Sequence, residues 1–368
     1  MKEVKFLDLK ANYPLVREEI SHKFEEIIDG SSFVSGKYVL EFENEFAKFV
    51  GAKHCVAVDS GTAALYLALL AHGIGEGDEV IVPVNTFIAT AEAVSLVGAV
   101  PVFVDNEEST YNIDVSKIEG SITARTKAII PVHLYGTCAS MDEIITCAQK
   151  HGLLVIEDAC QAHGASYKNA KAGSIGATAA FSFYPGKNLG AWGEGGAVTT
   201  SDDTIAQKLI LLRNHGSKIK YQHEIIGGNF RMSEFQGAVL STKLPHLESW
   251  NEQRRKNAAL YAQLLGENKK VVLPLYPNDS VPVWHLFVIR VSNREALMAH
   301  LQEKGIGVGI HYPVPLHLTP AYSYMRHAKG EFPVAEKLGG EIVSLPMYPE
   351  LSEEDIKYVS DTINEFLQ

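Results

Sequence analysis

Short apolar runs alternate with segments of three- to four-residue apolar spacing between residue 54 and about residue 200. Most of the runs are apolar throughout, as is typical of strands that are covered on both faces of a sheet. They span residues 54–58, 79–84, 100–105, 127–134, 153–158, 177–183 and 196–200. Segments 62–73 and 140–152 predict helices that end on Gly. This alternation predicts an α/β core with a central, mainly parallel sheet.

A second pattern begins near residue 245. Residues 245–266 predict one long helix, with apolar residues near one face. Beyond it we expect a strand at 285–291, a helix at 293–305, a strand at 306–310 and a last helix after Ser352. No flexible linker separates the two parts. We therefore expect an N-terminal segment and large α/β domain at 1–245, and a connecting helix with a smaller C-terminal α+β domain at 246–368.

Charge and composition exclude several classes of protein. The 368 residues include 33 Lys and Arg against 44 Asp and Glu, a formal net charge of -11, and no dense basic run argues for a nucleic-acid partner. The N-terminus lacks the apolar core of a signal peptide, and no apolar run approaches the roughly 18 residues of a membrane span. The four cysteines are scattered, as in reduced proteins. We expect a cytoplasmic protein without a membrane segment.

An anion site is predicted where strand 54–58 meets the next helix, at Ser60, Gly61 and Thr62. Gly61 allows the backbone to approach a ligand, while free N–H groups and the positive helix end face an anion. The alternative is that Ser60 only caps the helix. A phosphate fits the first interpretation.

A carboxylate pair, Glu157 and Asp158, ends the apolar strand at 153–158. A carboxylate in that position needs a cation or hydrogen-bond donors. A protonated pyridine nitrogen is such a cation, and the carboxylate in return keeps it protonated. Alternatively, Asp158 only caps the following turn. Gln161 and His163 are placed to orient the carboxylate or a ligand ring, although a single His is often only a core residue.

Lys187 follows strand 177–183 in a loop that is rich in Gly and Pro and almost free of other charge. Lysines that form Schiff bases need a lowered pKa, which a desolvated pocket supplies. Ser182 is placed to add a hydroxyl group to the phosphate site. The alternative is an ordinary surface lysine.

Together these segments resemble the DegT/DnrJ/EryC1/StrS family of aminotransferases. The similarity runs from FLDL near residue 6 through residues 33–65 and 227–240 to LPMYP at 345–349. It implies the fold type I architecture of enzymes that use pyridoxal 5'-phosphate (PLP), and a homodimer. Lys187 then matches the Schiff-base lysine, Asp158 the partner of the pyridine nitrogen and Gln161 a contact to the phenolic oxygen of the cofactor.

The resemblance also implies the remaining site residues. Ser60, Gly61, Thr62 and Ser182 match phosphate contacts, and Phe87 matches an aromatic ring that stacks on the pyridine. Asn229 matches a residue that reaches the phosphate of the neighbouring subunit. His311, Tyr312 and His317 resemble the stretch that shapes the pocket for the acceptor sugar. Glu194 stands where the family often has Asp, and Cys160 where Ala is common; neither change affects the expected chemistry.

The implied reaction transfers an amino group from L-glutamate to a nucleotide-linked keto-sugar. Residues 182–196, SFYPGKNLGAWGEGG, resemble relatives that act at C3, so a dTDP- or UDP-linked 3-keto-sugar is expected. A 4-keto-sugar or a cyclitol remains an alternative.

The sequence argues against three other classes of protein. A dinucleotide oxidoreductase would need GxGxxG between a strand and a helix, but the Gly cluster at 73–77 follows a helix. A metal hydrolase has no support, because the 14 His residues show no ligand spacing. The third is a PLP-binding regulatory protein without turnover, and the combination of Lys187, Asp158 and Gln161 argues against it.

Overall fold

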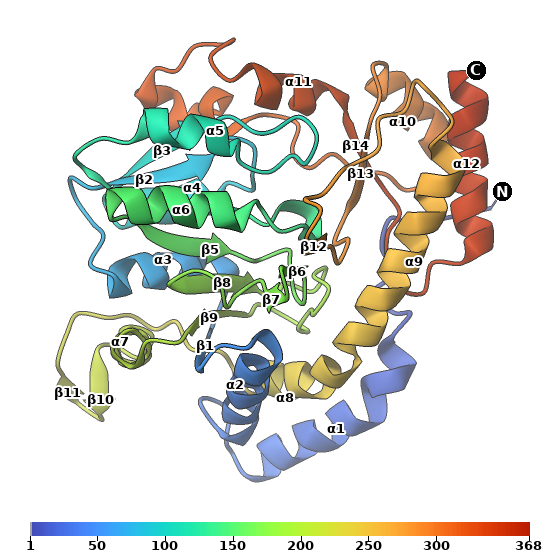
Figure 1. Cartoon of the computed structure of the whole chain (residues 1–368). Coiled ribbons are helices and arrows are strands. Elements are labelled where there is room, and N and C mark those ends of the chain that lie inside the picture. Colours follow the sequence, from blue (N-terminus) through green and yellow to red (C-terminus); the bar gives the residue numbers. More distant parts are fainter. Residues whose placement is uncertain (1) are drawn as a thin grey trace.

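A seven-stranded sheet forms the centre of the molecule in a computed structural model that describes residues 2–368 (Figure 1). Its order is β1-β9-β8-β5-β4-β2-β3. The strands are β1 (His54–Val58), β2 (Glu79–Pro83), β3 (Val100–Val104), β4 (Thr126–Ile129), β5 (Leu154–Asp158), β8 (Thr178–Ser182) and β9 (Gly196–Thr200). Within this sheet β9 alone runs opposite to the other strands, so its pairings with β1 and β8 are antiparallel and the rest are parallel. The predicted α/β class and the mainly parallel sheet are confirmed.

Helices cover both faces of the sheet, because alternate strand residues point to opposite sides. Ile81 packs with α2 (Lys37–Val50) and α6 (Met141–His151) in one apolar cluster. Its neighbours Val80 and Val82 pack with the helices of the other face. Those helices are α3 (Gly61–Ala71), α4 (Ala89–Leu96) and α7 (Asp203–Leu212). Because both faces of the sheet are buried, its polar groups lie mainly at the ends of the strands and in the loops there.

A smaller unit lies beside the sheet (Figure 1). In it, α9 (Leu247–Leu265), α10 (Arg294–Glu303) and α12 (Glu353–Leu367) surround an antiparallel pair, β13 (Phe287–Arg290) and β14 (Ile342–Leu345). The predicted long helix and last helix are confirmed, and Ser352 Oγ accepts a hydrogen bond from the Asp355 N–H at 3.1 Å. Residues 316–335 pack against the large sheet instead, and the boundary at 245/246 remains a prediction.

The other elements are short or peripheral. They are α1 (Tyr13–Asp29), α5 (Val115–Ile118), α8 (Glu234–Lys243), α11 (Pro333–Glu341), β6 (Ser166–Tyr167), β7 (Ala170–Lys171), β10 (Ser217–Ile219), β11 (Gln222–His223) and β12 (Ser280–Val281). No helix within residues 2–368 combines the length and the apolar character that crossing a membrane requires.

One strand prediction was wrong, and another was too long. Residues 306–310 form no strand, because Ile306 bridges to Val4 and Gly309 to Ser344, and two single bridges to different partners do not make a ladder. Strand 127–134 ends at Ile129. The residues that follow leave the sheet, and the His133 N–H donates to the Asp158 carbonyl oxygen at 3.0 Å. This departure builds part of the site described next.

Candidate active site

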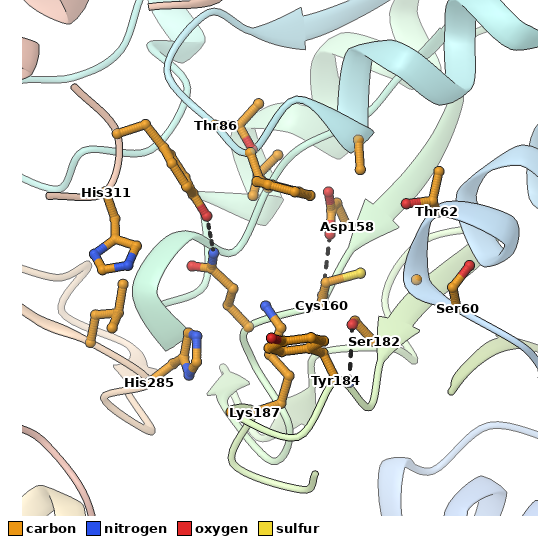
Figure 2. Close-up of a pocket in the computed structure, with 18 of the residues that line it drawn as sticks. Ser60, Thr62, Thr86, Asp158, Cys160, Ser182, Tyr184, Lys187, His285 and His311 are labelled. Carbon is orange, nitrogen blue, oxygen red and sulfur yellow. Dashed lines mark hydrogen bonds between the residues drawn. The ribbon is translucent and has the colours of Figure 1, made fainter. Parts of the chain in front are cut away.

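The carboxyl ends of β1, β5 and β8 open into one cavity of about 660 Å³ (Figure 2). Ten of the predicted site residues line it: Ser60, Gly61, Thr62, Phe87, Asp158, Gln161, Ser182, Lys187, His311 and Tyr312. They come from segments far apart in the sequence. Their convergence follows from the sheet, since parallel strands present their carboxyl ends at one edge.

An anion cradle forms at the start of α3. Ser60 does cap the helix, with its Oγ accepting from the Ala63 N–H at 3.1 Å, while its role toward a phosphate remains a prediction. The N–H groups of Gly61 and Thr62 precede the first helical hydrogen bonds and remain available to a ligand. A Cβ atom on Gly61 would lie 2.6 Å from Ser182 Cβ. Glycine is therefore required for the close approach of this turn to β8.

Asp158 is held on the cavity wall by two donors. The Thr90 hydroxyl donates to its Oδ2 at 2.7 Å, and the Cys160 N–H donates to its Oδ1 at 3.2 Å. The side chain is only partly satisfied by these bonds, because a carboxylate accepts about four. The remaining capacity suits a cationic ring N–H.

Glu157 points to the opposite face of β5 and is completely buried. Four donors reach its carboxylate: His133 Nε2 at 2.9 Å and the N–H groups of Gly173, Ile175 and Gly176 at 2.9, 2.8 and 2.7 Å. Burial acts to raise the pKa of Glu157, but these hydrogen bonds outweigh burial and lower it. The charged carboxylate clamps the end of β5 and thereby fixes the backbone of Asp158.

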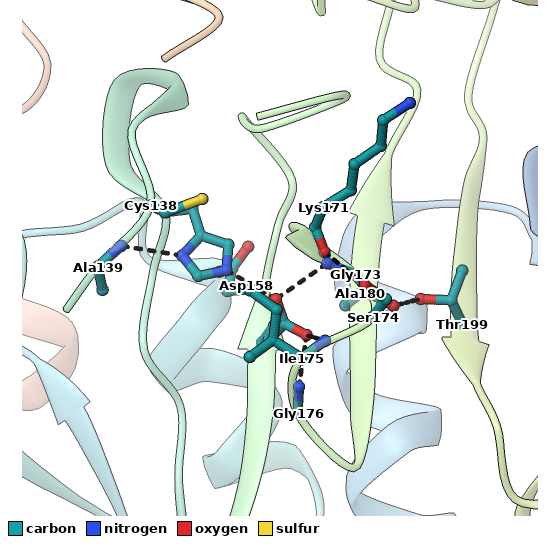
Figure 3. A network of polar contacts seen from close by, with 12 residues as sticks. Cys138, Ala139, Asp158, Lys171, Gly173, Ser174, Ile175, Gly176, Ala180 and Thr199 are labelled. Carbon is teal, nitrogen blue, oxygen red and sulfur yellow. Dashed lines mark hydrogen bonds and ion pairs between the residues drawn. The ribbon is translucent and has the colours of Figure 1, made fainter. Parts of the chain in front are cut away.

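Figure 3 shows the polar network at this end of β5, with Ala139 on one side and Gly173, Ile175 and Gly176 on the other. His133 completes the clamp in one tautomer. Its Nδ1 accepts from the Ala139 N–H at 3.2 Å, and a backbone amide can only donate. The ring proton therefore sits on Nε2 and points at Glu157. The loop after β4 is thus joined to β5 by side chain and backbone alike.

Lys187 reaches the cavity from the loop after β8, with its own N–H bound to the Tyr184 carbonyl oxygen at 2.8 Å. Burial lowers the pKa of Lys187, and nearby Cys160 and Asp158 counteract this only in part. A lowered pKa increases the fraction of free amine, which is the nucleophilic form. Among the described residues, Lys187 is the only Lys or Arg that lines the cavity.

Gln161 has a fixed orientation. Its Oε1 accepts from the Tyr135 N–H at 2.6 Å, and its Nε2 donates to Tyr312 Oη at 3.1 Å. Because the amide of Tyr135 can only donate, the NH₂ group of Gln161 is the end that faces Tyr312 and the cavity. The Phe87 ring, 53% exposed, lies 5.7 Å from the Tyr312 ring.

Two histidines add polar groups on the side of the smaller unit. His311 Nδ1 lies 2.8 Å from Ser344 Oγ, and burial, followed by the charge of Lys187, lowers the pKa of His311 to about 4. Burial also lowers the pKa of His285 well below its usual range. Both rings are therefore neutral near pH 7. Sequence reasoning missed His285, which belongs to no recognisable motif and is brought to the cavity by the loop before β13.

Two predicted site residues lie outside the cavity lining. His317 Nε2 is 3.1 Å from Glu336 Oε1, and its ring packs 4.7 Å from Phe332. Asn229 lies beyond β11, in a single bridge with Asn214.

His163 is a buried neighbour of the site. Its Nε2 lies 2.8 Å from the Ser182 carbonyl oxygen, and burial lowers its pKa to about 3.

Proteins of known sequence are similar to this chain over almost its whole length. The sequence model of the DegT/DnrJ/EryC1/StrS aminotransferase family matches residues 14–364. The chain is 46% identical to the dTDP-3-amino-3,4,6-trideoxy-alpha-D-glucose transaminase of Streptomyces venezuelae, over 99% of this chain and 96% of that protein. It is also 46% identical to the UDP-N-acetyl-3-dehydro-alpha-D-glucosamine 3-aminotransferase of Acidithiobacillus ferrooxidans, over 99% and 98%. A Geobacillus stearothermophilus relative, equally 46% identical over 99% and 98%, is named a pleiotropic regulatory protein.

A solved structure agrees with the sequence relatives. The crystal structure of S. venezuelae DesV in complex with a ketimine intermediate superposes with a TM-score of 0.98, at 45% identity, covering 100% of this chain and 99% of that one. Both the sheet and the loops that carry the cavity are thus shared with an aminotransferase. The chain belongs to the DegT/DnrJ/EryC1/StrS aminotransferase family.

Proposed function

We propose that this protein transfers an amino group from L-glutamate to a nucleotide-linked 3-keto-sugar, with PLP bound at Lys187. The observation that carries the proposal is the joint position of Lys187, Asp158 and the anion cradle in one cavity. An amine, a carboxylate and an anion site are the groups that PLP needs from a protein.

The residues present fit the cofactor. The cradle of Ser60, Gly61, Thr62 and Ser182 suits its phosphate, and Asp158 has unused acceptor capacity for the ring nitrogen. Gln161 presents its NH₂ group toward the cavity, as a phenolic oxygen requires. When bound, PLP supplies an electron sink for negative charge at the α-carbon of the donor.

Lys187 then acts as both anchor and base. Its lowered pKa leaves the amine free to take the proton from the α-carbon of glutamate and to return a proton in the second half of the reaction. The carboxylate of Asp158 stabilises the protonated form of the pyridine ring. Glutamate leaves as its 2-oxo acid before the keto-sugar enters, so we expect ping-pong kinetics.

The position of amination is the first test. Residues 182–196 resemble those of relatives that act at C3, and the two transaminases compared above are named for 3-amino or 3-dehydro sugars. We expect amination of dTDP- or UDP-linked 3-keto-sugars and little reaction with the matched 4-keto-sugars. Incubation with glutamate and each substrate, followed by NMR of the new C–N bond, measures this. Amination at C4 alone would contradict the C3 assignment and leave the cofactor assignment intact.

A regulatory role without turnover is the competing function, and the name of the Geobacillus relative favours it. Lys187, Asp158 and an oriented Gln161 around one cavity support turnover instead. Adding glutamate to the PLP-bound protein distinguishes an aminotransferase from a regulator without turnover. A change in visible absorbance with release of the 2-oxo acid indicates catalysis.

Composite sites in a homodimer are the second expectation. Near Asn229, the β10–β11 hairpin and the loop after it expose apolar side chains, with Ile226 96% and Tyr221 80% exposed. In a dimer, a partner subunit would cover these apolar side chains, and Asn229 of each subunit would reach the cavity of the other.

Subunit mixing tests this expectation. Lys187→Ala and Asn229→Ala proteins should each be inactive or weak alone, whereas a hybrid dimer contains one intact site. Random reassortment of equal amounts should restore about a quarter of the wild-type activity, as expected for a symmetric dimer. Mixed proteins without any gain, after exchange has been shown by mass spectrometry of tagged subunits, would disprove the composite site.

A further inference from the structure

Tyr135 contacts residues of the cavity wall from the loop that leaves the sheet after β4. It is 4% exposed and does not line the cavity. Its backbone is left-handed, with φ +58°, a conformation that is costly for a residue other than Gly. Such a conformation persists where surrounding contacts determine it, so its contacts are informative.

Those contacts reach three other parts of the site. The Tyr135 N–H donates to Gln161 Oε1 at 2.6 Å, and its carbonyl oxygen accepts from the Leu286 N–H at 3.3 Å. The phenol group donates to the carbonyl oxygen of His311. In the left-handed conformation, one residue serves all three segments.

A closed ring results. Gln161 Nε2 donates to Tyr312 Oη at 3.1 Å, Tyr312 follows His311 in the chain, and the His311 carbonyl oxygen accepts from Tyr135. Two members, Tyr135 and Gln161, belong to the large α/β part. The other two, His311 and Tyr312, line the cavity themselves.

We propose that Tyr135 is a positioning residue that holds the His311–Tyr312 segment in place for the acceptor sugar and couples it to Gln161. The proposal rests on the proposed function, in which His311 and Tyr312 shape the acceptor pocket. Without the phenol, the His311 carbonyl loses its Tyr135 hydrogen bond. Of the two hydrogen bonds that join His311 and Tyr312 to the large part, the one between Gln161 and Tyr312 then remains. The backbone N–H that orients Gln161 is unaffected by a change of side chain.

The chain offers a matched control in Tyr111. Its ring lies 5.8 Å from the Tyr135 ring, it is also buried at 2% exposure, and its φ is +65°. Its hydroxyl has no hydrogen-bond partner among the described residues. Tyr111→Phe and Tyr135→Phe thus remove the same atom from neighbouring sites, and only the second breaks the ring.

Steady-state kinetics with a 3-keto nucleotide sugar and glutamate test the proposal. Tyr135→Phe should raise the KM for the acceptor about tenfold, equivalent to about 1.4 kcal/mol, with the KM for glutamate and the Kd for PLP near those of the wild type. Hydrogen–deuterium exchange of the loaded enzyme should become faster in residues 306–316. Tyr111→Phe should leave all four measurements unchanged.

Each contrary result is decisive. The proposal is overturned if both variants behave alike, or if Tyr135→Phe lowers kcat with both substrates while the acceptor KM and the exchange of 306–316 stay constant. Should Tyr135→Phe fail to fold, Tyr135→His, which can retain a donor, must fold and keep a lower acceptor KM than Tyr135→Leu. If the wild type aminates no keto-sugar, the proposed function has failed, and exchange in 306–316 still reports on the ring.

Discussion

Lys187→Ala is expected to abolish transamination completely. Among the described residues, no other Lys or Arg lines the cavity, so no amine remains there to hold the cofactor or to move the proton. Turnover with glutamate and keto-sugar is measured directly. The substitution should not destabilise the fold, because Lys187 is at the cavity surface. Thermal unfolding of the protein without cofactor should therefore stay close to that of the wild type.

Borohydride reduction identifies the attachment site independently of activity. After reduction and digestion, the added mass of the cofactor should be found on the peptide that contains Lys187. Lys171 provides the control, since burial also lowers its pKa and its Nζ lies 3.7 Å from the centre of the Phe49 ring, away from the cavity. Lys171→Ala should keep both label and activity. A label on any other lysine would refute the assignment.

Asp158→Asn is expected to reduce kcat by roughly 10²- to 10³-fold, the scale on which removing a preorganised electrostatic group acts. The amide cannot stabilise a protonated ring, yet it can keep both existing contacts. Its oxygen can accept from the Cys160 N–H and its NH₂ group can donate to Thr90 Oγ1. The fold should therefore tolerate the change, which single-turnover absorbance and thermal unfolding measure together.

Asp59→Asn is the matched control for this prediction. Asp59 directly follows strand β1, much as Asp158 ends β5, but it lies outside the lining of the main cavity. Its substitution should change kcat only a few-fold. Comparable losses in the two variants, or near-normal activity of Asp158→Asn, would mean that the ring nitrogen has a different partner.

Strand position was the most predictable part of this fold. Apolar runs at 54–58 and 196–200 coincide with β1 and β9, because strands buried on both faces leave a continuous signal. The position of Asp158 and Lys187 in one cavity followed from parallel strands that share a carboxyl edge. The residues that fix those side chains were harder to predict from the sequence. Tyr135 belongs to no motif, and its contacts depend on a left-handed backbone that the sequence does not display. His285 reaches the cavity only through the path of a loop.

Two further features could not be predicted from the sequence, namely the place of His317 and the direction of β9. His317 lies six residues after His311, in the same motif, yet a turn of 3₁₀ helix directs it to Glu336. Spacing along the chain does not reveal such a turn. The antiparallel direction of β9 was not foreseen either, since an apolar strand looks the same in both directions.

The place of β1 at the edge of the sheet has a consequence for synthesis of the protein. Its only strand partner in the described sheet is β9, about 140 residues further along the chain. At about 5–20 residues per second, a ribosome needs roughly 7–28 seconds to cover that distance. During this interval β1 has an unpaired, apolar edge that is open to association with other nascent chains. The cradle at its end also remains incomplete, so we expect newly made chains to acquire PLP only after β9 has emerged.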